Sequence, residues 1–157
     1  MYGTYETIDG KPAVRFERVY PHPVEHVWRS VTEPDELANW FPTTVDVDLR
    51  EGGAMAFTFP GGEMDPMDGS VVELDPPRRF AFMWGTELLR FELAPEGEGT
   101  RLTLTHLISN SDEAARNAAG WHACLDKLGA VESDWEPLYE EYRRRGLPAG
   151  AVIPEHS

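Results

Sequence analysis

The sequence predicts an α+β fold in which a curved antiparallel sheet of about seven strands wraps around one long C-terminal helix, with two short helices after the first strand. Apolar and polar residues alternate over most of residues 45–108, which is typical of half-buried strands joined by Gly- and Pro-rich turns. Near Asn110 the period changes to about 3.6 residues, which is typical of an amphipathic helix. Together these patterns indicate a sheet covered on one face by a helix.

The N-terminal third contains the first strand and both short helices. Residues 1–12 are polar with little periodicity, so we expect a flexible N-terminal arm or an edge strand there. Residues 14–20 alternate and predict the first strand. Residues 24–31 repeat apolar side chains at intervals of three and four, which predicts a helix. A second short helix starts near Pro34 and ends at Pro42.

The rest of the chain is a strand meander followed by helices. Asn110 and Glu113 have the spacing of a capping box, so we expect the long helix over residues 111–132. A further short helix is expected over residues 135–142, with Pro137 in its first turn. The expected strands of the meander cover residues 45–49, 55–59, 70–75, 80–84, 88–94 and 100–108.

Length and composition limit the classes of protein that the chain can represent. Its 157 residues fit one domain, which we place at 13–145, with a flexible arm over 1–12 and a C-terminal tail over 146–157. Lys and Arg number 14 against 28 Asp and Glu, a net charge of −14, so neither a nucleic acid nor an anionic lipid surface is an expected partner. The lone Cys124, the lack of a signal-like N-terminus and the lack of a long apolar run predict a cytoplasmic protein without membrane insertion.

Four stretches, spread over most of residues 13–142, resemble one family. They are Pro23-Val24-Glu25-His26-Val27-Trp28 with Thr32-Glu33-Pro34 and Trp40-Phe41; Gly69 through Glu73 to Pro76-Pro77-Arg78-Arg79 and Trp84; Gly99-Thr100-Arg101-Leu102-Thr103-Leu104-Thr105-His106; and Gly120-Trp121-His122 with Leu125. In order and spacing they are similar to the activator homologues of the heat-shock-protein-90 ATPase, within the START-like SRPBCC superfamily of helix-grip proteins.

The resemblance implies a bacterial-type stand-alone domain with a hydrophobic cavity between sheet and long helix, which binds a small lipophilic or aromatic molecule. It implies no shared catalytic constellation, because relatives range from lipid carriers to polyketide cyclases and aromatases. Eukaryotic co-chaperones of the family also use an additional N-terminal domain, for which this chain has no room. A co-chaperone-like protein-binding module is therefore the weaker alternative, and a homodimer is a possible assembly.

Alternation places a set of aromatic side chains on the concave face of the sheet, where they either line a cavity or form an ordinary core. The resemblance favours the cavity. We expect Trp28 to be structural, Trp40 and Phe41 to lie near the cavity rim, and Trp121 to be either ligand-lining or core. The expected ligand-binding residues are Trp40, Phe41, Phe57, Phe59, Phe82, Trp84, Phe91, His106, Trp121 and Leu125.

His106 carries the alternative of an enzyme. It shares a strand face with Leu102 and Leu104, so it is either a core histidine satisfied by a backbone carbonyl, which we favour, or the ligand partner or general base of a cyclase, aromatase or hydrolase. His122 points about 100° away from Trp121 on the helix and is expected to be structural or on the surface.

No cofactor, metal or catalytic residue is predicted. The acidic residues between Asp46 and Asp75 lack an EF-hand pattern and fit a solvated face. The histidines lack zinc spacing, Cys124 lacks a second cysteine, and no phosphate-binding loop or nucleophile-elbow motif is present in the sequence.

Overall fold

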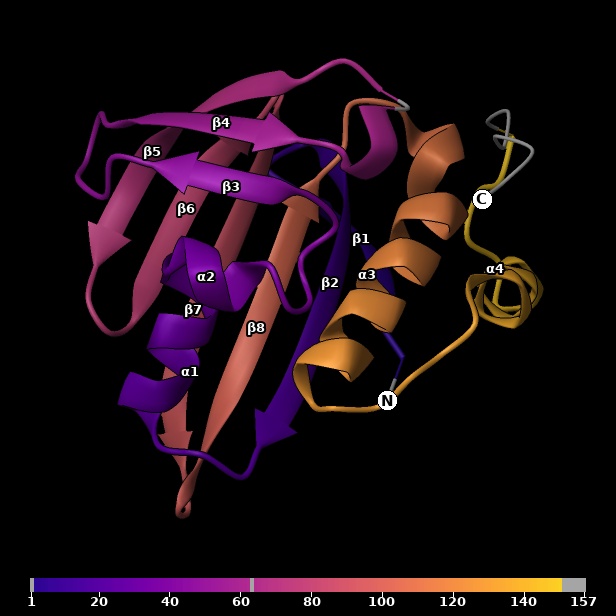
Figure 1. Cartoon of the computed structure of the whole chain (residues 1–157). Coiled ribbons are helices and arrows are strands. Elements are labelled where there is room, and N and C mark those ends of the chain that lie inside the picture. Colours follow the sequence, from indigo (N-terminus) through magenta and orange to yellow (C-terminus); the bar gives the residue numbers. More distant parts are fainter. Residues whose placement is uncertain (1, 63, 151–157) are drawn as a thin grey trace.

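The computed structural model describes residues 2–62 and 64–150, and within them eight strands form one antiparallel sheet in the order β1-β2-β8-β7-β6-β5-β4-β3 (Figure 1). The strands are β1 (Thr4–Ile8), β2 (Lys11–Tyr20), β3 (Thr44–Val47), β4 (Ala54–Thr58), β5 (Met67–Asp75), β6 (Arg79–Trp84), β7 (Glu87–Glu96) and β8 (Gly99–Leu107). The α-helices are α1 (Val24–Thr32), α2 (Pro34–Leu37), α3 (Ala114–Leu128) and α4 (Trp135–Arg144), with 3₁₀ turns η1 (Pro60–Gly62) and η2 (Ser111–Glu113).

The helices α1, α2 and α3 lie on the same side of the curved sheet, and α4 packs against α3 (Figure 1). This is the predicted helix-grip arrangement, and the long helix is confirmed over residues 111–128, although it ends four residues before the expected Glu132. It begins with η2, where the Asn110 side chain accepts a hydrogen bond from the Asp112 N–H at 3.0 Å, and α3 ends before Gly129. A β-carbon at Gly129 would come within 3.2 Å of the Tyr20 ring, so close approach to the sheet explains this glycine.

The N-terminal segment is an edge strand, so of the two alternatives expected for residues 1–12 the structure has the strand and not the flexible arm. Strand β1 pairs with β2 from Thr4 opposite Arg15 to Ile8 opposite Lys11, and it adds an eighth strand to the sheet. The hairpin turn is Asp9-Gly10, whose φ angles of 52° and 77° match the Asp-Gly turns that favour tight hairpins. The polar strand lacks periodicity because it lies at the sheet edge.

The start of the expected C-terminal tail also packs on the domain. The backbone N–H of Leu147 donates to the Tyr142 carbonyl at 3.1 Å, and the Pro148 carbonyl accepts from the Ala115 N–H at 2.9 Å. Leu147 is buried against the core. Residues 151–157 of the expected tail lie outside the described residues.

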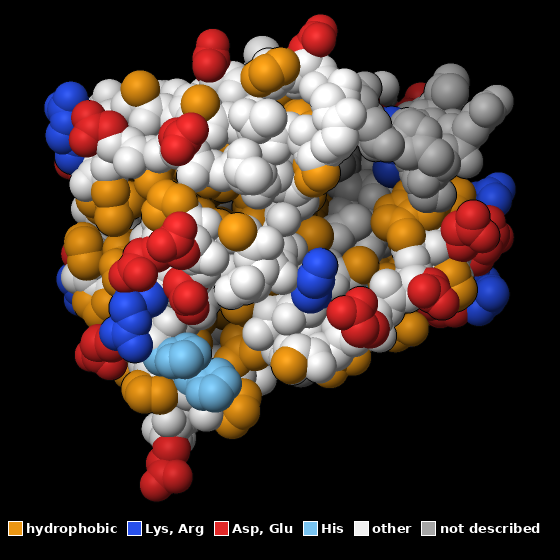
Figure 2. All heavy atoms as spheres, in the orientation of Figure 1, with side chains coloured by type: hydrophobic (Ala, Val, Ile, Leu, Met, Phe, Trp, Pro, Cys, Tyr) orange, Lys and Arg blue, Asp and Glu red, His pale blue; other side chains and the backbone are white. Residues whose placement is uncertain are grey.

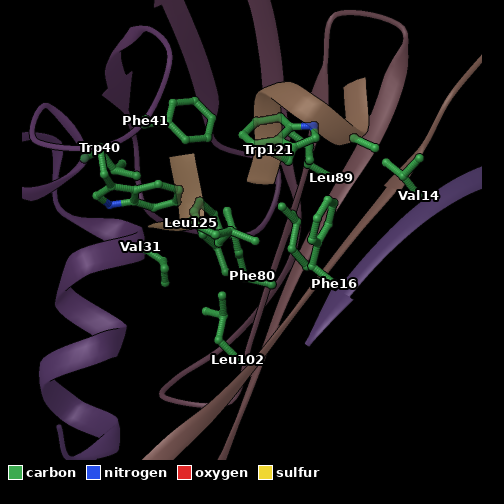
Figure 3. Close-up of a cluster of buried hydrophobic side chains, with 14 of the residues drawn as sticks. Val14, Phe16, Val31, Trp40, Phe41, Phe80, Leu89, Leu102, Trp121 and Leu125 are labelled. Atoms are coloured by element: carbon green, nitrogen blue, oxygen red, sulfur yellow. The ribbon is translucent and has the colours of Figure 1, made fainter. Parts of the chain in front are cut away.

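The core fills the space between the sheet and α3. Phe16, Phe80, Leu89 and Leu102 project from the sheet toward Leu125 of α3 (Figure 3). Trp28 packs edge-to-face on Phe80, with ring centroids 6.4 Å apart. Across the described part of the chain, no helix is long and apolar enough to cross a membrane.

Candidate ligand-binding site

Eight of the residues expected at the ligand form one continuous group of aromatic rings on the concave side, here called the aromatic cluster. Its buried members pack tightly, and Phe59 and Trp84 are partly exposed. Neighbouring ring centroids lie between 4.8 Å apart, for Phe57 and Trp84, and 6.5 Å apart, for Phe41 and Phe57. The members are Trp40, Phe41, Phe57, Phe59, Phe82, Trp84, Phe91 and Trp121. Leu125 lies beside the cluster in the core.

Phe41 occupies the middle of this cluster. It follows α2, and its ring lies 5.3 Å from Trp84 and 5.5 Å from Trp121 between centroids (Figure 3 shows it beside Trp121). Its neighbour Trp40 is fixed by a 2.8 Å hydrogen bond from its indole N–H to the Ser30 carbonyl. Trp40 and Phe41, expected near a cavity rim, are only 3% and 7% exposed, so both rings belong to the buried core.

A hollow of about 200 Å³ opens to solvent where α3 meets the aromatic cluster, and we call it the α3 recess. Trp84 and Trp121 belong to the aromatic cluster and also line the α3 recess, and their ring centroids are 6.0 Å apart. Larger hollows of about 270, 480 and 550 Å³ contain none of the residues expected at the ligand. The lining of the recess consists of Pro42, Trp84, Arg116, Asn117, Gly120, Trp121 and Cys124.

His106 lies in a chain of hydrogen bonds that begins at Trp121. The indole N–H of Trp121 donates to His106 Nδ1 at 2.9 Å. An indole nitrogen can only donate, so Nδ1 is the acceptor and the ring proton is on Nε2, which lies 2.6 Å from Glu87 Oε1. Glu87 Oε2 in turn accepts from the Ser109 N–H at 2.9 Å and from its hydroxyl at 2.7 Å.

This chain replaces the backbone carbonyl that we expected as the partner of His106. His106 is 1% exposed and both ring nitrogens are engaged, so the side chain orients Trp121. Burial by itself would raise the pKa of Glu87, but the hydrogen bonds from His106 and Ser109 outweigh it and lower the pKa to about 2. Sequence reasoning missed Glu87. The sequence feature that could have identified Glu87 is its position on the inward strand face, which it shares with the apolar Leu89 and Phe91.

His122 belongs to a second polar network, on the side of α3 that faces β2 and α4. The Tyr142 hydroxyl lies 2.7 Å from His122 Nδ1 and accepts the Gly3 N–H at 2.8 Å. Asp126 accepts from Arg18 at 2.6 Å and from the Ser133 hydroxyl at 2.5 Å. Burial and the nearby Arg18 charge lower the pKa of His122 to about 4, so the ring is neutral near pH 7. The structural role expected for His122 agrees with this position.

The charged side chains on the visible face of the molecule do not gather in one place. On the face in Figure 2, acidic and basic side chains are scattered, with hydrophobic side chains between them. Among residues 2–62 and 64–150, no group of three or more His, Cys, Asp or Glu side chains could hold a metal ion.

Comparison with known proteins places the chain in a family. The family model of the Activator of Hsp90 ATPase homolog 1-like protein matches residues 21–132. CalU16 from Micromonospora echinospora is 26% identical, with a TM-score of 0.71 over 91% of this chain and 92% of that chain. CV1439 from Chromobacterium violaceum is 30% identical, with a TM-score of 0.62 over 78% and 99%.

A conserved protein of unknown function, EF2215 from Enterococcus faecalis, has the same fold, with a TM-score of 0.77 at 21% identity over 91% of this chain and 89% of that chain. None of the curated proteins compared with the chain matches it. The chain belongs to the Activator of Hsp90 ATPase homolog 1-like family of SRPBCC-type proteins.

Proposed function

We propose that this protein is a small-molecule-binding domain that takes up a lipophilic or aromatic ligand at the α3 recess. Membership of the family favours a ligand-binding domain. The observation that carries the proposal is the continuity of aromatic surface. Trp84 and Trp121 wall the recess and contact Phe41 behind it, so rings lead from solvent into the interior.

The recess is smaller than an ordinary ligand pocket, so a side chain must move to admit the ligand. Its 200 Å³ is smaller than the ~300 Å³ at which ordinary ligand pockets begin. Phe41 lies on the connection between α2 and β3, outside regular secondary structure, whereas Phe57, Phe82 and Phe91 are fixed in the sheet. Displacement of the Phe41 ring therefore enlarges the site at the lowest cost, and a ligand ring replaces its contacts with Trp84 and Trp121.

The enzyme alternative built on His106 finds less support. A general base must present a nitrogen to the substrate, and both nitrogens of His106 are occupied by Trp121 and Glu87. His106 also does not line the α3 recess. The geometry favours binding over a reaction that starts from this histidine.

Binding of a neutral naphthalene dye, N-phenyl-1-naphthylamine, tests the proposal. Trp84→Ala removes a partly exposed wall of the recess, and Trp28→Ala removes an equally large, partly buried side chain that packs on Phe80 elsewhere. We expect the wild type to bind the dye, Trp84→Ala and Trp121→Ala to weaken binding about tenfold or more, and Trp28→Ala to leave it unchanged. A wild type that binds no dye, or equal loss in Trp28→Ala and Trp84→Ala, contradicts the proposal.

A further inference from the structure

Buried polar atoms without a partner point to what the recess receives. Among the described residues such side-chain atoms occur in Arg18, Thr43 and Asn117. Asn117 lines the α3 recess, and Thr43 directly follows Pro42, which also lines it. Native proteins pair nearly all buried polar atoms, so each exception needs an explanation. The Asn117 Nδ2 is shielded from solvent and has no acceptor, and the residue lines the recess, so a ligand that widens the recess supplies one.

The position of Asn117 puts its amide beside the aromatic wall. Asn117, Gly120, Trp121 and Cys124 follow the three- and four-residue spacing of one face of α3. Gly120 carries no side chain, and a β-carbon there would lie 4.0 Å from the indole nitrogen of Trp135. The indole N–H of Trp121 is directed to His106, and in Figure 3 the indole nitrogen points away from Phe41. The indole therefore offers the recess apolar ring atoms, and the amide of Asn117 supplies a donor.

The charge of the lining argues against an ionic group deep in the recess. Burial raises the pKa of the Cys124 thiol to about 12, so it stays neutral. Arg116 is held by Glu113, with Nη2 2.6 Å from the carboxylate oxygen. Pro42, Gly120 and the two tryptophans are uncharged. The net charge of −14 further disfavours an anion.

We infer that the ligand of the α3 recess is a neutral aromatic compound that carries a hydrogen-bond acceptor, such as a ketone, whose oxygen receives the Asn117 Nδ2–H while its ring packs on Trp84 and Trp121. The inference rests on the proposed function and names the chemistry of its ligand. Asn117 is then the residue that selects for the acceptor.

Three probes of the same ring system test it: 2-acetonaphthone, which has a carbonyl acceptor; 2-ethylnaphthalene, which lacks one; and 2-naphthoate, which is anionic. Binding is measured by equilibrium dialysis against the wild type, Asn117→Leu and the control Asn39→Leu, which replaces an exposed asparagine after α2. We expect the wild type to bind the ketone about tenfold tighter than the hydrocarbon and the carboxylate. Asn117→Leu abolishes this preference without weakening the hydrocarbon, and Asn39→Leu retains it.

The outcomes separate this inference from the proposed function. If the wild type binds ketone and hydrocarbon equally, or binds the carboxylate best, the inference is wrong and the proposed binding function stands. If the wild type binds none of the three probes, both are wrong. Comparison of the probes in the wild type decides the matter even where a variant is unstable.

Discussion

The two sides of helix α3 differ in how their polar side chains are partnered. On the side that faces β2 and α4, His122 is hydrogen-bonded to Tyr142, and Asp126 to Arg18 and Ser133. On the side that faces the recess, the Asn117 amide nitrogen has no acceptor. The first side joins segments far apart in the sequence, since Gly3 also donates to Tyr142. The recess on the second side opens to solvent, although the Asn117 Nδ2 itself is buried. The same helix therefore bonds to other elements on one side and carries an unpartnered amide nitrogen on the other.

Buried polar residues of such a domain fall into two groups, according to where their hydrogen-bond partners lie. A polar group whose partners belong to other structural elements stabilises the fold, and its loss leaves those partners unsatisfied. A buried donor that has no partner does not stabilise the fold, because it has lost its hydrogen bonds to water and gained none in exchange. Stability and ligand binding should consequently respond to different residues of α3.

The largest expected effect follows from Asp126→Ala. The Arg18 side chain is only 10% exposed, and its Nε and Nη2 have no partner, so removal of Asp126 leaves an uncompensated buried charge. We expect a loss of about 3–5 kcal/mol in the free energy of unfolding, measured by urea denaturation. The double variant Arg18→Met with Asp126→Ala should recover at least half of the loss. A single variant that loses less than about 1 kcal/mol contradicts the anchoring role.

A smaller effect is expected from pH on the anchored side. His122 has a pKa of about 4 in the folded protein and 6.5 as its ordinary value, so the unfolded chain binds a proton that the folded protein does not. Stability is therefore full above pH 6.5 and falls as the pH decreases toward 4. Between pH 7 and 5 we expect the free energy of unfolding of the wild type to fall by about 1–2 kcal/mol more than that of His122→Gln. Urea denaturation at each pH measures both values. If they fall by the same amount in the two proteins, His122 does not titrate in this way.

Glu87 takes no part in that pH window. Its pKa of about 2 keeps the carboxylate ionised in the folded protein at pH 5 and above. The charge on Glu87, at one end of the hydrogen-bond chain beside the recess, is therefore the same at pH 7 and pH 5.

The sequence predicted most of what depends on local periodicity. Alternation placed Phe57, Phe82 and Phe91 on one face because strand side chains alternate, and the 3.6-residue period located α3. Glu87 was missed because its partner is set by the register of β7 with β8, where Leu89 lies opposite His106, and local patterns do not encode pairing.

The interior was predicted less well, for a different reason. Whether Phe41 lines a cavity or fills it depends on the path of a connection after α2, which has no regular period. The network around Asp126 joins β2, α3 and the segment before α4, and such long-range side-chain bonds have no local signature. Strand β1 was left as one of two alternatives, although Asp9-Gly10 is a hairpin signal.

The smallest expected effect on stability distinguishes the recess side most sharply. Asn117→Leu removes a buried donor that has no acceptor, and Leu favours helix more than Asn does. We expect the variant to unfold within about 0.5 kcal/mol of the wild type, or to be slightly more stable. His122→Leu, a matched change on the anchored side, deprives Tyr142 and Asp126 of a partner and should cost about 1–3 kcal/mol. Urea denaturation at pH 7 measures both. If Asn117→Leu is as destabilising as His122→Leu, the Asn117 amide holds the fold together, and the recess no longer offers a donor reserved for a ligand.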